Sequence, residues 1–146
     1  KGIRAIPTDL EWETELKDIN VKDREELLRS IAVMNLKKTP GGHTTVVDNF
    51  NDAVERDRKF IKRQIKIYAP NLIICCGSII GDAIEGIFPE EIHWEATSRG
   101  VWFSQFIEGS TLIYFSHPEA RVSSNFLHYA LMDTIKSLPS PTLKRE

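Results

Sequence analysis

The stretch that decides the fold is residues 72–87, Leu-Ile-Ile-Cys-Cys-Gly-Ser-Ile-Ile-Gly-Asp-Ala-Ile-Glu-Gly-Ile. Its first five residues are a continuous apolar run with the length and composition of a buried strand. Gly77 and Ser78 form a tight turn, and the apolar residues after them recur at the spacing of one helix face. The stretch therefore predicts a strand, a tight turn and a helix, the unit from which open α/β sheets are built.

Further elements are expected on both sides of this unit. The upstream elements are a short charged helix over 23–28, a buried strand over 31–34 (Ile-Ala-Val-Met) and a long helix over 51–68. The downstream elements are strands over 101–106 and 112–115 and a helix over 123–137. Because helices alternate with apolar strands, we predict a three-layer α/β/α sandwich with a central, mostly parallel four-stranded sheet. Residues 1–138 are expected to form one α/β domain, and residues 139–146 a flexible C-terminal tail.

The composition is that of an ordinary globular protein. Hydrophobic residues make up 41% and charged residues 27% of the 146-residue chain, and no apolar run approaches the roughly 20 residues that cross a bilayer. The only cysteines, Cys75 and Cys76, are adjacent and are expected to be buried, reduced thiols. Reduced thiols and the absence of a signal-like apolar segment near Lys1 together predict a cytoplasmic protein without membrane contact. A net charge of −2 leaves room only for a local basic patch.

Polar residues at three strand ends carry the functional signal, since ligands of open α/β sheets bind outside the carboxyl ends of the strands. Asn35 has a donor and an acceptor suited to the edge of a pyrimidine, although Asn also commonly turns the chain. Gly77 and Ser78 combine close backbone approach, a hydroxyl and free helix amides, which suits a phosphate. An ordinary N-cap is the alternative for Ser78. His117, stiffened by Pro118, suits a substrate carbonyl, or is simply a satisfied polar residue.

A basic stripe and two histidines are the other candidate functional features. The long helix carries a basic stripe that either follows a phosphate backbone or forms a solvated face: Lys59, Lys62, Arg63 and Lys66. His43 and His93 lie far apart without a second ligand at metal spacing, so no metal site is expected.

Taken in order, three segments resemble the motifs of the uracil-DNA glycosylase superfamily. They are Met34-Asn35 after its apolar run, residues 64–78 (Gln-Ile-Lys-Ile-Tyr-Ala-Pro-Asn-Leu-Ile-Ile-Cys-Cys-Gly-Ser) and residues 116–123 (Ser-His-Pro-Glu-Ala-Arg-Val-Ser). The resemblance covers residues 31–138. It implies a four-stranded parallel sheet and an enzyme that cleaves a base from DNA.

The resemblance also implies roles for single residues. Asn35 would read the uracil, His117 would bind its carbonyl as the catalytic residue, and Arg121 or Val122 would enter the duplex as a wedge. The phosphate or DNA contacts would come from Gly77, Ser78, Arg121 and Ser123. The family's first motif, which supplies the water-activating residue, has no counterpart before Ile31, which indicates a divergent member or a fragment. The cysteine ligands of the family's iron–sulfur branch are missing too, so no cofactor is expected.

Three functions follow from these observations. The first is a uracil-DNA glycosylase-like protein that binds a nucleobase in DNA and hydrolyses its N-glycosidic bond. The second is a catalytically degenerate module that binds a nucleotide or nucleic acid. The third is an α/β protein-interaction domain, with Trp94 and Trp102 as candidate contacts.

Overall fold

The computed structural model describes residues 21–29, 31–40 and 47–138. In order, the elements are α1 (Val21–Leu28), α2 (Val47–Tyr68), β1 (Leu72–Cys76), α3 (Ser78–Ile87), β2 (Glu95–Ala96), β3 (Trp102–Gln105), the 3₁₀ helix η2 (Ile107–Gly109), β4 (Thr111–Phe115) and α4 (Ser124–Ser137). The short strand β2 was not predicted, because its two residues belong to no apolar or alternating run. The predicted tail over 139–146 and the candidate ligand His43 lie outside the described residues.

The described strands form one mixed sheet in the order β1-β4-β3-β2. Only β1 and β4 are parallel, with Cys76 level with Phe115, and the other two pairs are antiparallel. The prediction of a mostly parallel sheet was therefore wrong. The reason is the short connection through η2 between β3 and β4: a parallel neighbour needs a crossover of about a dozen residues or more, whereas a short turn brings the chain back antiparallel.

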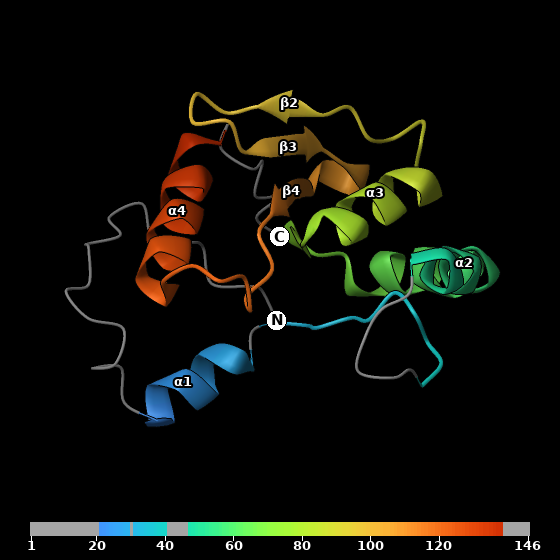
Figure 1. Cartoon of the computed structure of the whole chain (residues 1–146), viewed down its shortest axis with the longest axis horizontal. Coiled ribbons are helices and arrows are strands. Elements are labelled where there is room, and N and C mark those ends of the chain that lie inside the picture. The colour runs from blue at the N-terminus through green and yellow to red at the C-terminus, as the bar shows by residue number, and fades with distance from the viewer. Residues whose placement is uncertain (1–20, 30, 41–46, 139–146) are drawn as a thin grey trace.

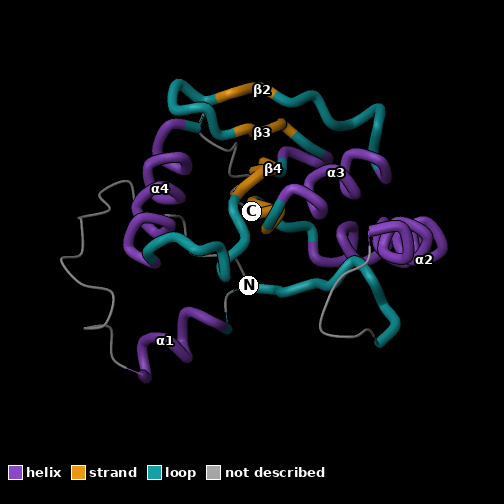
Figure 2. The backbone as a smooth tube through the Cα atoms, in the orientation of Figure 1, coloured by secondary structure: helices purple, strands orange, loops and turns teal. Residues whose placement is uncertain are grey.

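Residues 31–34 form no strand, so that part of the prediction was also wrong. The segment is irregular, as Figure 2 shows, and Ile31 and Val33 expose 58% and 85% of their surfaces. Strand composition alone does not make a strand, because the backbone groups need a neighbouring strand to pair with. No described strand pairs with this segment, which is held at its far end by the buried side chain of Leu36.

Helices cover both faces of the sheet. Figure 1 shows α3 and α2 on one side of the strands and α4 on the other. Successive residues of β4 divide between the two resulting cores, because side chains of a strand alternate between its faces. Leu112 packs in the cluster that contains residues of α2 and α3, whereas Ile113 packs in the cluster that Leu131 and Ile135 of α4 cover. The chain is therefore an α/β protein with a four-stranded mixed sheet.

Candidate functional site

Two of the predicted site residues, Gly77 and His117, lie side by side just after the parallel strands β1 and β4. The Gly77 N–H donates to the Phe115 carbonyl oxygen over 2.8 Å, which continues the parallel ladder past the end of β1. A Cβ placed on Gly77 would lie 3.7 Å from the Cβ of His117, so the two loops are in van der Waals contact. Gly77 has a φ of 102°, a conformation that glycine adopts without strain. Both residues therefore lie at the same edge of the sheet, next to the carboxyl ends of β1 and β4.

The His117 imidazole has one of its two nitrogens already engaged. Its Nδ1 accepts a hydrogen bond from the backbone N–H of Glu119 over 3.1 Å. The backbone carbonyl oxygen of His117 accepts one from the N–H of Ala120 over 2.9 Å, so the loop turns tightly around the imidazole. A neutral imidazole that accepts at Nδ1 has its proton on Nε2. His117 is exposed, so its Nε2–H is available as a donor to a bound carbonyl.

Ser78 is the first residue of α3, but the N-cap is Gly77, and no side chain supplies a capping hydrogen bond. The interpretation of Ser78 as an ordinary N-cap is therefore wrong. Its exposed hydroxyl has no hydrogen-bond partner among the described residues, and it stands beside the N–H groups that every helix leaves free in its first turn. Serine hydroxyl and helix amides together suit an anion.

Tyr114 ties the start of α3 to β4. Its hydroxyl makes hydrogen bonds to the carbonyl oxygen of Ser78 over 3.1 Å and to Oδ1 of Asp82 over 3.0 Å. Partial burial, followed by the Asp82 carboxylate, raises the pKa of Tyr114, so the phenol keeps its proton and remains a donor. The helix start is therefore fixed relative to the loop that carries His117.

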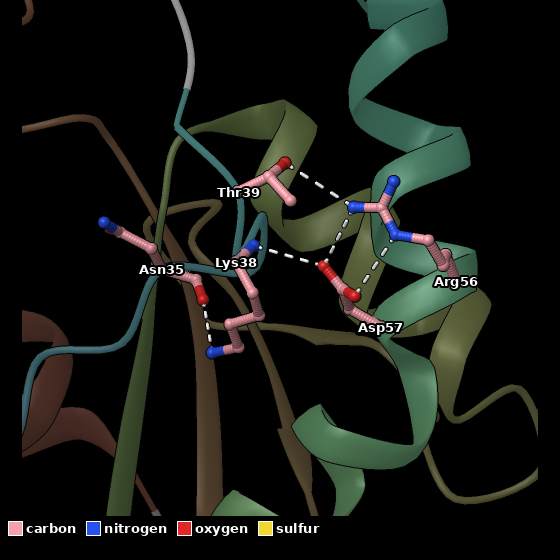
Figure 3. A network of polar contacts seen from close by, with 5 residues as sticks. All are labelled: Asn35, Lys38, Thr39, Arg56 and Asp57. Atoms are coloured by element: carbon pink, nitrogen blue, oxygen red, sulfur yellow. Dashed lines mark hydrogen bonds and ion pairs between the residues drawn. The ribbon is translucent and has the colours of Figure 1, made fainter.

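Asn35 is not joined to this edge by any hydrogen bond among the described residues. It is exposed, and only its backbone carbonyl is engaged, by the Lys38 ammonium over 2.5 Å. In Figure 3 the Asn35 carboxamide points away from the other labelled side chains. The structure thus brings together Gly77, Ser78 and His117, whereas no hydrogen bond among the described residues links Asn35 to them.

Asp57 connects the chain after Asn35 to α2 through hydrogen bonds, and the sequence analysis missed this residue. Asp57 is only 7% exposed, and its carboxylate accepts the Lys38 backbone N–H over 3.2 Å and the Arg56 guanidinium over 3.3 Å (Figure 3). The Arg56 hydrogen bond is the main reason that the pKa of Asp57 lies below its usual value, and the Lys38 N–H adds to it. Burial lowers the pKa of Lys38, which the Asp57 charge partly opposes.

A sequence signal for Asp57 exists. It lies three residues after Val54 and four before Ile61, on the face of α2 that the apolar spacing turns inward. A carboxylate on such a face must be paired or hydrogen-bonded, since leaving it buried alone costs too much free energy. The spacing therefore carried a signal for a partner from another segment that the sequence analysis did not use.

The loop that follows His117 holds the two other predicted contacts. Ser123 is the N-cap of α4, and its Oγ accepts the Phe126 N–H over 3.2 Å. Arg121 is exposed and makes no ion pair with any described residue. Both residues are therefore open to solvent on the same loop, Ser123 with its own hydroxyl proton still free to donate.

The two cysteines are unsuited to chemistry. Both are free, Cys75 is buried and Cys76 half-buried. Burial, with a smaller effect of the neighbouring thiol, raises the pKa of Cys75 to about 12, and burial also raises the pKa of Cys76. In the described part of the chain no three metal-ligating side chains cluster, and no helix there has the length and apolarity to cross a membrane.

Searches of family models, of curated proteins and of solved structures each returned no match to this chain.

Proposed function

We propose that the edge formed by Gly77 and His117 binds a nucleobase, in DNA or in a nucleotide, and that the protein is a uracil-DNA glycosylase-like hydrolase. The observation that supports this is the contact between the two loops together with the Glu119 N–H on Nδ1 of His117. The imidazole then offers its Nε2–H to a base carbonyl. A donor at that position stabilises the negative charge that develops on a departing pyrimidine.

Recognition of the base requires that the nucleotide leave the stack, because its reactive bond is otherwise out of reach. In the proposal Asn35 reads the edge of the flipped base, for which its exposed carboxamide supplies both a donor and an acceptor. The flanking phosphates are bound by the Ser78 hydroxyl, the first turn of α3 and the exposed Arg121 and Ser123. The free thiols Cys75 and Cys76 are compatible with action in the cytoplasm, which is part of the same proposal.

A binding module without catalysis is the second candidate. It is favoured by the engagement of two carboxylates: the buried Asp57 accepts hydrogen bonds from Arg56 and from the Lys38 N–H, and the exposed Asp82 accepts one from Tyr114. The water-activating motif of the uracil-DNA glycosylase superfamily also has no counterpart before Ile31. In this version the base pocket is retained and the N-glycosidic bond stays intact.

One experiment separates the candidates. Single-stranded and duplex oligonucleotides with one uracil are incubated with the protein, and binding and alkali-labile abasic sites are both measured. We expect binding that His117→Ala and Asn35→Ala each weaken, with the exposed His93→Ala as the control that removes an imidazole elsewhere. Abasic sites that disappear in His117→Ala identify the hydrolase, and binding without them identifies the binding module. Absence of binding at low salt contradicts both.

A further inference from the structure

A second helical seam runs along α2, beside the face that packs on α3. Ala53, Asp57, Phe60, Gln64 and Ile67 recur at alternating spacings of four and three residues, as the core positions of a heptad repeat do. The first two are buried, and residues 36–39 approach the helix there through Leu36 and the bond from the Lys38 N–H to Asp57. Phe60 and Ile67 expose 63% and 66% of their surfaces. The seam is therefore covered over its first half and open over its second.

Gln64, which lies between the two exposed apolar residues, indicates that the open half of the seam lacks a hydrogen-bond partner. Its Oε1 is buried yet has no hydrogen-bond partner among the described residues. A buried amide oxygen without a partner destabilises the fold, because it has lost its hydrogen bonds to water. The side chain as a whole is only half buried, so rotation about its own bonds presents the amide to a donor on a docked segment.

The charge beside the seam defines the partner. Lys59, Arg63 and Lys66 are exposed and form no ion pair with any described residue, and no Asp or Glu occurs between Arg58 and Tyr68. Lys62, the fourth cation of the basic stripe, has its ammonium 4.8 Å from the centre of the Phe88 ring. Two copies of this chain pairing through the seam would bring their cations together, which is unfavourable. A carboxylate-rich partner meets the same cations favourably.

This surface is separate from the candidate nucleobase site. The C-terminal end of α2 leads through Pro70 into the first residue of β1, whereas Gly77 follows the last residue of β1. The open half of the seam therefore belongs to the amino end of β1 and the candidate site to its carboxyl end. A phosphate backbone would use the cations but not Phe60 and Ile67, so the combination favours a protein over a nucleic acid.

We propose that Phe60, Gln64 and Ile67, flanked by Lys59, Arg63 and Lys66, form a docking surface for an acidic amphipathic helix of a partner protein. The apolar residues of that helix pack on Phe60 and Ile67, and a polar side chain meets Gln64. Its flanking carboxylates pair with the three cations. The proposal is independent of the nucleobase-binding function.

The test uses a synthetic helical peptide of about 20 residues, long enough to be helical by itself, with leucines at heptad core positions and glutamates beside them. A second peptide has lysine in place of every glutamate. Binding to the full chain is measured by fluorescence anisotropy, and the contact is mapped by NMR shifts. We expect the acidic peptide alone to bind, with shifts confined to residues 59–68. Phe60→Ser and Ile67→Ser should each weaken binding about tenfold, as loss of an anchor residue does.

Arg63→Glu should weaken the acidic peptide as well, and raised salt should do the same. Phe126→Ser, which removes an aromatic residue of α4 that is as exposed as Phe60, is the matched control and should leave binding unchanged. Circular dichroism establishes that each variant is folded, and since Phe60, Ile67 and Arg63 are exposed we expect native melting curves. Equal binding of the lysine peptide, or binding that survives both serine substitutions, overturns the proposal. So does a uracil-free oligonucleotide that displaces the peptide and still binds Phe60→Ser unchanged, because the surface is then a phosphate contact.

Discussion

Gly81 of α3 lies directly against the ring of Tyr114 on β4. A Cβ on residue 81 would stand 2.0 Å from Cε2 of Tyr114 and 2.2 Å from Cδ2, closer than any side-chain contact allows. The missing side chain lets the first turns of α3 approach the sheet, where the Tyr114 hydroxyl reaches Ser78 and Asp82. The glycine thus determines how the helix start, and with it Gly77, sits beside His117.

Gly81→Ala should destabilise the protein, because the ring of Tyr114 or the whole helix must shift. Overpacking of this kind costs about 1–3 kcal/mol, against which alanine regains about 1 kcal/mol of helix propensity. Gly86 lies in the same helix and a Cβ there meets nothing within 4 Å. Gly86→Ala should therefore be neutral or stabilising by up to about 1 kcal/mol. Urea unfolding of the two variants checks this, and equal stabilities would contradict the contact.

The hydrogen bonds of Asp57 should make stability fall in acid. The pKa of Asp57 is lower in the folded chain than the usual value of about 3.9, so the unfolded state takes up the proton first. This contribution to stability is present above that usual value and is lost as the pH falls from there through the folded pKa. Asp57→Asn removes this group from the titration. Thermal melts between pH 7 and pH 3 should show a smaller decrease for the variant than for the parent, and parallel decreases would contradict the assignment.

The thiol of Cys75 should be almost unreactive in the folded protein. Its pKa of about 12 leaves very little thiolate at pH 8.5, and its side chain is buried. Cys76→Ser, which leaves Cys75 alone, should react with a disulfide reagent far more slowly than Cys75→Ser, which leaves the half-buried Cys76. Because the folded pKa is raised, stability should also fall as the pH rises above about 8.5, where the unfolded thiol ionises. Rapid reaction of Cys75 before unfolding would contradict its burial.

The sequence was sufficient to predict the secondary structure where that structure depends on a local pattern. Residues 72–87 form a strand, a turn and a helix as predicted, because apolar run, Gly77 and helical spacing act within a few residues. Residues 31–34 have equally good strand composition but form none, because a strand depends on a neighbour that composition does not specify. The direction of β3 depended on the short turn before β4. The prediction of a mostly parallel sheet used only the alternation of helices and strands and did not consider the length of this turn.

The same distinction applies to the site. Gly77 and His117 were each predicted to follow a strand, and they lie together because the carboxyl ends of the adjacent parallel strands β1 and β4 share an edge. Asn35 was expected there only through the strand over 31–34, and without that strand the expectation lost its basis. Asp57 was hidden among the charged residues of α2, since its burial depends on how residues 36–39 lie on the helix.

Ser123 provides a prediction that separates a structural role from a ligand contact. Its Oγ caps α4 by accepting the Phe126 N–H, so Ser123→Ala should cost about 1 kcal/mol of stability whether or not DNA binds. Asp and Asn cap helices as well as Ser does. Ser123→Asp and Ser123→Asn should therefore both retain stability, but only the aspartate adds a negative charge to the loop.

If Ser123 faces a phosphate, as proposed, Ser123→Asp should weaken oligonucleotide binding several-fold at low salt and lose that effect as salt screens the repulsion. Ser123→Asn is the matched control, and it should bind close to the parent because it carries no charge. Equal binding by the two variants would leave the hydroxyl with its capping role alone. Anisotropy titrations at two salt concentrations, with urea unfolding on the same samples, measure both properties.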